Sequence, residues 1–572
     1  MAPSSATLSK SESDSEKGDV AAKQNPQEQP NPQPPTVPTK VNSEKYFDRH
    51  DGETKSVGTA SIASRRNPAI NTHQPKPRDQ HEIDTEKGPA HNNEEQDDSS
   101  LVGWDGPDDP HNPMNWSSWL KVSNIILISG ITFVTPLASS MAAPGVPLIM
   151  REFESTSTEL AAFVISVYVL GFAFGPMFLA PMSETYGRLP IYHICNVFFN
   201  LFNIACALAK NLDMLIGFRF LAGIFGSVAL TNGGGTITDI VRQEKRGRAM
   251  SFFVIGPLLG PIIGPIAGGY LSEAKGWRWV FWVLSILGGL FTILCFIFLR
   301  ETYAVVLLER KTQRKIKETG NINLRSKLDN RLSAKDLFLR AIVRPYKLLI
   351  LSPIVLFTSI YVGLIYAYLY LLFTTFTSVF EESYGFSPGT VGLSYLGLGI
   401  GSMMGLTIFA VISDRLLKKM TKEGDLAAVR DGKPPPGMKP EYRLPPMAYC
   451  AWLIPAGFFI YGWTTRYKVH WIVPIMSTSL IGIGNLAVFM CIQMYLVDAY
   501  TIFAASALAA NTIIRSIMAA VLPLCGQKMY DALGLGWGNS LLAFLALAGL
   551  PIPWALMIWG EKLRNKFKVT HL

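Results

Sequence analysis

The sequence predicts an all-α integral membrane protein with twelve transmembrane helices in two pseudo-symmetric six-helix bundles. Three observations support this fold class: long uncharged apolar stretches after about Trp119, an alternation of charge between connecting loops, and acidic residues that recur at matching places in the two halves. A stretch of roughly 18 or more apolar residues is the length that a helix needs to cross about 30 Å of hydrocarbon.

The twelve spans are predicted from these apolar stretches. They are expected at 120–141, 160–182, 190–209, 212–238, 248–271, 277–299, 348–374, 389–412, 446–464, 470–497, 502–525 and 537–560. The same stretches predict five regions: a disordered cytoplasmic tail over 1–103, a first bundle with its lead-in over 104–300, a cytoplasmic loop over 301–347, a second bundle over 348–560 and a cytoplasmic tail over 561–572.

Loop charge predicts the orientation. Basic residues gather in loops that follow even-numbered spans, and the segment 300–347 alone holds thirteen Lys or Arg against five Asp or Glu. The opposite loops carry acids such as Glu152 and Glu381. Because basic loops stay in the cytoplasm, both termini are expected there.

The two halves resemble each other in their charged helix ends. Span two ends at Ser183-Glu184 and span eight at Ser413-Asp414, while spans four and ten end at Asp239 and Asp498. Repeats of this kind build transporters whose substrate site lies between the halves. A channel or a membrane enzyme does not require them.

Composition excludes several other functions. The chain is basic, with a formal net charge of +9, but no basic stripe carries interleaved aromatic residues, so nucleic acid is not an expected partner. The six cysteines show no CxxC spacing, so neither a metal site nor a disulfide framework is expected. The expected partners are a small-molecule substrate, protons and the lipid bilayer, for a monomer with no cofactor.

Span five carries the most specific motif, GPLLGPIIGPIAGG over 256–269. Its glycines recur every four residues and form a bare stripe that lets another helix approach closely. The pattern Gly260-x-x-x-Gly264-Pro265-x-x-Gly268-Gly269 resembles the antiporter motif of the major facilitator superfamily. The lead-in WDGPDDPHNPMNWSSW over 104–119 is similar to the stretch before helix one in fungal drug exporters of that superfamily. The resemblance covers about 104–560 and implies a drug:proton antiporter with twelve spans.

The loop between spans two and three reads PMSETYGRLP over 181–190. It resembles the superfamily signature G-x-x-x-D-x-x-G-R, with Ala180 for the first glycine and Glu184 for the aspartate. The resemblance implies that Glu184 and Arg188 help to close the cytoplasmic side. A helix cap with a positive-inside arginine is the simpler alternative.

Arg219 lies deep in span four, where a charged side chain must face protein or a wet cavity. With Gly223 and Gly226 it matches the superfamily motif on helix four, whose arginine is linked to proton transfer; a snorkelling arginine is the alternative. Asp239, twenty residues later, is about 30 Å away along a straight helix. Asp239 is therefore expected beside Glu184 and Arg188 at the gate.

Arg515 on span eleven is the second deep charge, and no Asp or Glu stands at the middle of any span. The proton-carrying group is therefore expected nearer a helix end. Asp239 and Asp498 are the first candidates, with Glu184 and Asp414 after them.

The substrate wall is expected to consist of aromatic and uncharged polar residues, as in other apolar drug pockets. The candidates are Tyr366, Tyr370, Asn232, Gln493 and Asn511. A mostly uncharged cavity of this kind predicts hydrophobic or weakly basic cargo, such as drugs or toxic metabolites. Packing against lipid or protein is the alternative role for the aromatic residues.

Two other functions remain open. One is a nutrient importer, which the end of span six disfavours because Arg300-Glu301-Thr302 differs from the PESPR-like sequence of sugar porters. The other is a transporter-like sensor that signals through its tail. The plasma membrane is the expected location, with the vacuolar membrane as the alternative.

Overall fold

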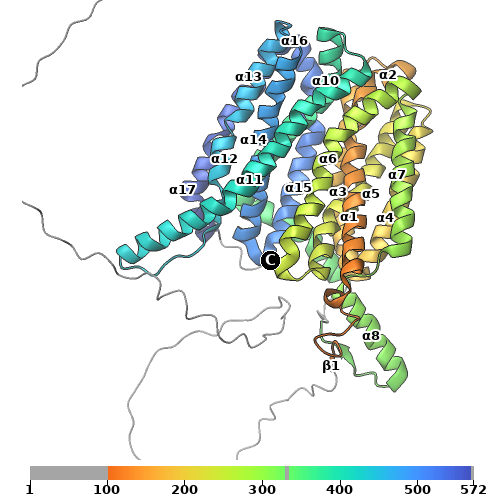
Figure 1. Ribbon diagram of the computed structural model, residues 1–572, viewed down its shortest axis with the longest axis vertical. Helices are drawn as coiled ribbons and strands as arrows, with labels where there is room; N and C mark the ends of the chain where they lie inside the picture. Colours follow the sequence, from red (N-terminus) through yellow and green to blue (C-terminus); the bar gives the residue numbers. More distant parts are fainter. Residues whose placement is uncertain (1–100, 329–333, 568–572) are drawn as a thin grey trace, which may run out of the picture. The chain divides into compact units, whose positions relative to one another are not determined.

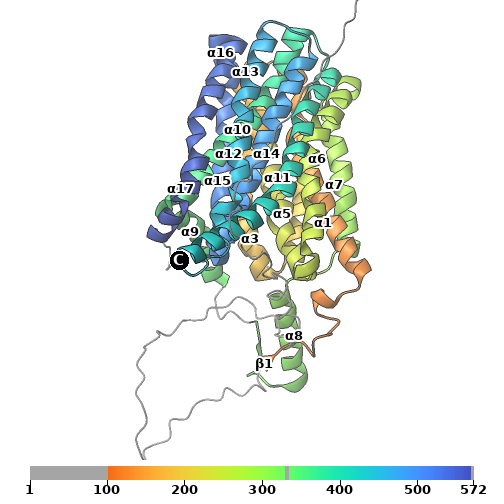
Figure 2. The same cartoon turned by 60° about the vertical axis from the view of Figure 1, so that its left-hand side comes forward.

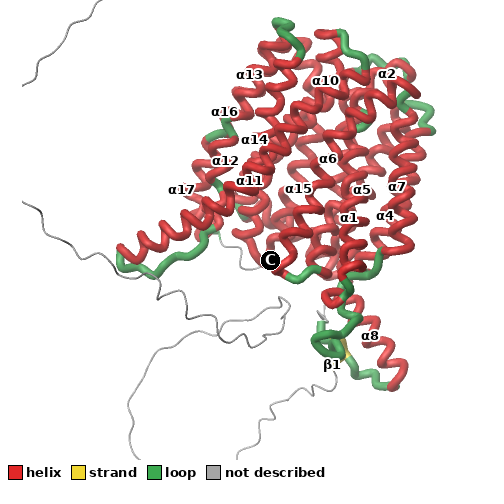
Figure 3. The backbone as a smooth tube through the Cα atoms, viewed as in Figure 1, coloured by secondary structure: helices red, strands yellow, loops and turns green. Residues whose placement is uncertain are grey.

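The computed structural model of the protein describes residues 101–328 and 334–567. The predicted disordered tail lies outside these residues over 1–100. The described chain is helical apart from short loops and one pair of two-residue strands (Figure 3).

Six long helices form the first half of the bundle (Figure 1). They are α1 (Ser118–Ser140), α3 (Thr158–Tyr186), α4 (Arg188–Ala207), α5 (Leu212–Ile240), α6 (Gln243–Lys275) and α7 (Arg278–Phe298). The short η3 (Ala143–Gly145) and α2 (Val146–Glu152) connect α1 to α3. Predicted spans one to six each coincide with one long helix.

The second half contains the remaining spans. They are α10 (Pro353–Tyr384), α11 (Pro388–Arg430), the pair α12 (Pro445–Cys450) and α13 (Leu453–Arg466), α14 (Ile472–Tyr500), α15 (Ala504–Val521), and α16 (Gly526–Gly549) with α17 (Pro551–Lys566). Span nine is thus two helices that meet at Ala451 and Trp452.

By length and composition alone, ten stretches of the described chain are long and apolar enough to cross a membrane. This number is two lower than the twelve predicted spans, for two reasons. The broken ninth span leaves α13 with only 14 residues, and residues 504–566 count as one stretch of 63 residues. A straight helix of that length would measure about 95 Å, three times the hydrocarbon thickness. Gly534, with a φ of 72°, interrupts it, and α15 packs on α10 while α16 packs on α13.

Helix packing repeats between the halves. In the first half α3 packs on α5, α1 on α6 and α4 on α7. In the second half the matching pairs are α11 with α14, α10 with α15 and α13 with α16. The two halves meet through α6 against α11, which Figure 2 shows side by side, and through α3 against α15. These two contacts are equivalent under the same pseudo-symmetry. The two halves therefore pack as two copies of one structural repeat.

Two helices extend beyond the predicted spans. Span eight was expected to end at 412, but α11 continues to Arg430 and projects away from the other helices in Figure 1. The segment expected as the loop 301–347 contains α8 (Ala304–Thr319) and most of α9 (Ala334–Leu351). Span seven consequently begins at Pro353 rather than at 348.

The lead-in before α1 is fastened to α8. Strand β1 (Leu101–Val102) pairs in parallel with β2 (Arg325–Ser326), and Lys311 Nζ of α8 lies 2.8 Å from Asp105 and 3.2 Å from Asp109. Burial alone would raise the pKa of Asp109, but hydrogen bonds from the Asp105 and His111 amides and from Lys311 hold it well below its ordinary value. The aspartates of the lead-in therefore tie it to the central segment.

Candidate functional site

The glycine stripe of α6 faces protein along its length. An added Cβ at Gly260 would lie 2.7 Å from the Leu137 nitrogen of α1, and at Gly264 it would collide with the Ser140 hydroxyl. At Gly268 it would collide with the Met141 carbonyl, and at Gly269 with the Pro388 carbonyl at the start of α11. The stripe thus brings α6 into backbone contact with α1 and, at its end, with the other half.

The prolines of α6 lie within this continuous helix. Pro257, Pro261 and Pro265 interrupt its hydrogen bonding without ending it. From the other half, an added Cβ at Gly392 of α11 would lie 2.5 Å from the Pro265 carbonyl. Neighbouring helices therefore pack against the part of α6 whose hydrogen bonds the prolines remove. Such packing is what allows proline inside a membrane span.

Arg219 is enclosed by backbone carbonyls. Its side chain is 1% exposed, and its nitrogens donate to Val164 of α3 and to Ala138 and Ser139 of α1. No carboxylate of the described residues forms an ion pair with it. In this conformation Arg219 joins α1, α3 and α5 through these carbonyls, and its expected link to proton transfer stays a prediction.

A hydroxyl pair connects this arginine region to the second half. Ser139, whose carbonyl accepts from Arg219, has its hydroxyl 3.2 Å from the Tyr370 hydroxyl of α10. The Tyr370 ring lies 5.2 Å from the Tyr366 ring, measured between centroids. The guanidinium carbon of Arg515 lies 4.6 Å from the Tyr366 centroid. The two deep arginines are thus the ends of one continuous series of contacts across the interface.

Arg515 projects from α15 between two aromatic rings. Its guanidinium carbon is also 5.0 Å from the Phe489 centroid on α14. Beside these rings is a narrow gap, too small in this conformation for a water molecule, lined by Val362, Ile365, Tyr366, Asn485, Val488 and Phe489. Asn485 donates to the Ile365 carbonyl at 2.8 Å.

The other predicted substrate residues lie in different places. Asn511 is fully buried one turn before Arg515, and neither polar atom of its side chain has a partner in the described structure. Gln493 lies one turn after Phe489 on α14 and is half-buried. Asn232 is remote from this group, because its Oδ1 accepts from Ser183 at the end of α3. Asn232 therefore belongs with the charged cluster described next rather than with the aromatic wall.

A charged cluster occupies one end of the first half. Arg188 Nε lies 2.6 Å from Asp239 Oδ2, which joins the start of α4 to the end of α5. Glu184 is exposed and forms no ion pair among the described residues. Glu301, for which the sequence predicted no role at this site, is 6% exposed and accepts from the Arg188 and Leu189 amides at 3.0 and 3.2 Å.

The second half has a matching cluster. Arg443 lies 2.9 Å from Asp498 and 2.9 Å from Asp414, the two acids that echo Asp239 and Glu184. Arg443 was missed because 29 residues separate it from Asp414, whereas its counterpart Arg188 lies four residues after Glu184 within one short motif. The only available signal was a single arginine in the short PEYR segment over 440–443.

Contacts between the halves gather at the opposite end. Glu273 at the end of α6 accepts from the Gly389 amide at 2.8 Å and from the Ser387 hydroxyl at 3.0 Å. Ser166 of α3 donates to the Ala520 carbonyl at 2.9 Å, and Glu159 pairs with Lys528. These contacts hold the halves together at the end that contains Glu273.

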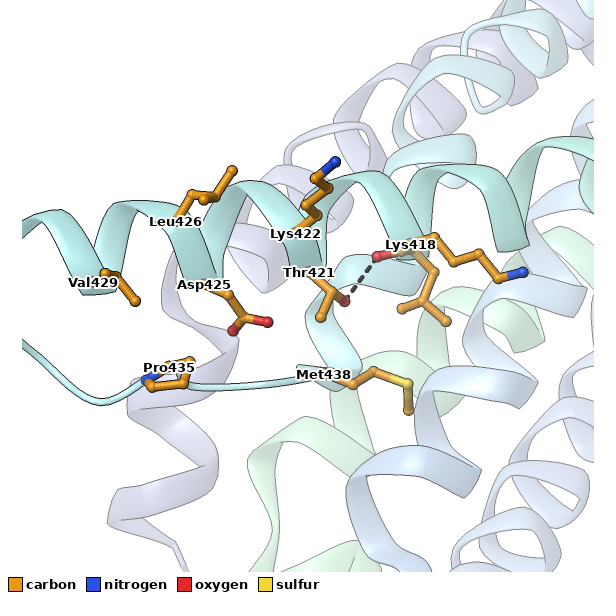
Figure 4. Close-up of a pocket in the computed structure, with 9 residues that line it drawn as sticks. Lys418, Thr421, Lys422, Asp425, Leu426, Val429, Pro435 and Met438 are labelled. Atoms are coloured by element: carbon orange, nitrogen blue, oxygen red, sulfur yellow. Dashed lines mark hydrogen bonds between the residues drawn. The ribbon is translucent and has the colours of Figure 1, made fainter. Parts of the chain in front are cut away.

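A separate groove of about 720 Å³ is lined by residues between 417 and 438 (Figure 4). It opens between the extension of α11 and the returning loop, where Thr421 and Asp425 of the helix face Pro435 and Met438. Since it lies outside the spans, it does not contribute to the interface between the halves.

The protein consists of two bundles that share one packing pattern. Their interface is rich in aromatic residues, and each bundle has a matching charged cluster. These features are typical of a secondary transporter. The chain matches the model of the Major Facilitator Superfamily over residues 128–523 and belongs to that family. It is 60% identical to the MFS-type transporter tndD of Aspergillus flavipes, over 82% of this chain and 86% of that protein. It is 51% identical to the efflux pump radE of Floropilus chiversii, over 82% and 86%.

Solved structures agree on the fold. The partially occluded inward open conformation of the xylose transporter XylE from E. coli matches with a TM-score of 0.57 at 14% identity, covering 76% of this chain and 98% of that one. The protein is therefore a multi-pass fungal-type transporter of the major facilitator superfamily and not an enzyme.

Proposed function

We propose that this protein is a proton-coupled exporter of small hydrophobic compounds. The single observation that carries the proposal is the glycine-proline helix α6, whose stripe contacts α1 along its length and α11 at Gly269. A helix that touches both halves through bare backbone can transmit relative movement between them, which fits the antiport that its motif implies. The name of the efflux pump relative supports the outward direction.

The distribution of contacts supports alternating access. In this conformation the halves are joined at the end that contains Glu273, while each half keeps its own cluster, Arg188 with Asp239 and Arg443 with Asp498, at the other end. Rocking of the halves would break the first set and bring the clusters together. Asp239 and Asp498 are the proposed proton-coupled carboxylates, and no bound cofactor is needed.

The same proposal places the charged clusters and both termini in the cytoplasm of a plasma-membrane monomer. The excess of basic residues near α8 and α9 supports this orientation. Protease-sensitive epitopes at each terminus and after α8 would be protected in intact cells. Cleavage from outside at any of them would reverse the orientation.

A vesicle assay tests the function. Vesicles with the cytoplasmic face outward should accumulate a fluorescent apolar compound when their lumen is acidified, and a protonophore should abolish the accumulation. Accumulation driven by a gradient of the opposite sign would indicate an importer. Absence of movement in either direction would favour the sensor.

A further inference from the structure

Arg515 is a partly buried cation within α15 that the described fold leaves without an anion. Its Nε is buried and has no hydrogen-bond partner, and it forms no ion pair within the described parts of the chain. Burying such a charge within a span costs at least about 2.5–3.5 kcal/mol on insertion scales. The faces of Tyr366 and Phe489 offset only part of this cost, because a ring and a cation attract each other by about 0.5–2 kcal/mol.

The other deep arginine differs on this point. Each of the three guanidinium nitrogens of Arg219 donates to a carbonyl of α1 or α3, and the residue is 1% exposed. Arg219 has therefore satisfied its donors within the protein. Arg515 has not: it is partly exposed in this conformation, and its buried Nε has no partner in the described structure.

A second observation points to the same place. Asn511 lies four residues before Arg515 on the same face of α15, is fully buried, and leaves both its amide nitrogen and its carbonyl oxygen unpaired in the described structure. A buried polar group without a partner is costly unless a ligand supplies one. The amide and the guanidinium together provide donors one helical turn apart.

The apolar spans offer no negative charge to balance the positive charge of Arg515. Acidic residues lie near the ends of the apolar spans predicted from the sequence, and no carboxylate of the described chain forms an ion pair with Arg515. A protonated amine entering the gap beside Tyr366 would meet a like charge. Weakly basic cargo, one of the two classes expected from the sequence, is therefore disfavoured.

We propose that the cargo is an organic acid with an apolar, ring-containing body, bound as its anion. Arg515 pairs with the acidic group, Asn511 donates beside it, and Tyr366 and Phe489 flank the ring system. This inference rests on the proposed export function and names its cargo class. The gap is closed in the present conformation, so binding requires the halves or the α10 and α14 side chains to separate.

Three pyrene probes of equal skeleton test the charge preference: pyrenebutyrate, pyrenebutanol and pyrenebutylamine. Their binding to the full-length protein in lipid nanodiscs is measured by fluorescence anisotropy, with empty nanodiscs subtracted. The acid should bind about tenfold or more tightly than the alcohol, as one charge-assisted hydrogen bond provides. The amine should bind most weakly. An alcohol or amine that binds as tightly as the acid would overturn the proposal.

Substitutions at Arg515 test whether this residue causes the preference for the acid. Arg515→Gln should reduce the affinity for the acid to that for the alcohol, and should change the affinity for the alcohol by less than about twofold. Arg515→Lys should retain part of the preference. Arg430→Gln, at the exposed end of α11, is the matched control and should change neither affinity. If Arg515→Gln does not fold, Asn511→Leu serves, with an expected loss of severalfold for the acid alone.

The outcomes separate the two proposals. If the alcohol binds while the acid has no advantage, the proposed export of hydrophobic compounds stands and the cargo class is wrong. An unchanged affinity for the acid in Arg515→Gln would likewise make this arginine a packing residue. If none of the three probes binds, the hydrophobic export function itself is contradicted.

Discussion

The hydroxyls of Ser139 and Tyr370 lie 3.2 Å apart and join α1 of the first half to α10 of the second. The Ser139 carbonyl also accepts from Arg219, and the Tyr370 ring lies against Tyr366, which Arg515 covers. Under the proposed rocking of the halves, this contact belongs to one conformation. It therefore couples the surroundings of both deep arginines to the state of the interface.

Gly264→Leu should abolish transport while the protein remains in the membrane. A side chain at this position would collide with the Ser140 hydroxyl and approach the Leu137 carbonyl, so α6 could not stay in contact with α1. Gly217→Leu is the control, because an added Cβ at Gly217 meets nothing within 4 Å. Transport is measured per protein at the cell surface, and a fully active Gly264→Leu variant would remove the main support for antiport.

Arg219→Ala should remove uphill transport and lower the thermal stability. It removes the donors to the Val164, Ala138 and Ser139 carbonyls, and a buried carbonyl in the last turn of α1 that is left unsatisfied costs about 1–3 kcal/mol. Arg219→Lys should rescue only partly, because one ammonium cannot follow the planar fork to carbonyls on two helices. Efflux from vesicles with and without a proton gradient is the measurement. A variant that pumps as well as the parent would place the proton path elsewhere.

Asp239→Asn and Asp498→Asn should each impair coupled transport, because each removes the charge that faces Arg188 or Arg443. Exchanging the charges, with Arg188→Asp and Asp239→Arg together, should restore part of the activity if the pair acts mainly through its ionic contact. Proton uptake and cargo movement are recorded in the same vesicles. Normal coupling in Asp239→Asn together with Asp498→Asn would exclude both as proton carriers.

Glu273→Ala should favour the conformation open at the Glu273 end, because the Gly389 amide and the Ser387 hydroxyl lose their acceptor. A cysteine at Thr377, which is buried and donates to the Ala143 carbonyl across the interface, reports the opening. A membrane-impermeant maleimide added from that side should label it faster in Glu273→Ala than in the parent. Glu382→Ala, an exposed position on α10, should leave the rate unchanged.

The sequence by itself determined the membrane fold and its division into halves. Hydrocarbon thickness sets the length of an apolar span, so the spans could be located from composition, and the glycine spacing of α6 marked it as a packing helix. The break near Ala451 and the continuation of α11 to Arg430 were missed, whereas the break at Gly534 falls between the expected spans 502–525 and 537–560. Hydropathy reports the medium around a segment and carries little information on where its helix bends or ends.

Only the tertiary structure decided which charges meet. Arg443 reaches Asp498 and Asp414, Glu301 caps the start of α4, and Arg219 binds carbonyls rather than a carboxylate. These partners are separated by 29 to 113 residues along the chain. Helix packing alone brings them together, because a polar group in a low-dielectric interior pairs with whatever donor or acceptor the neighbouring helices present. The same packing left Arg515 without such a partner.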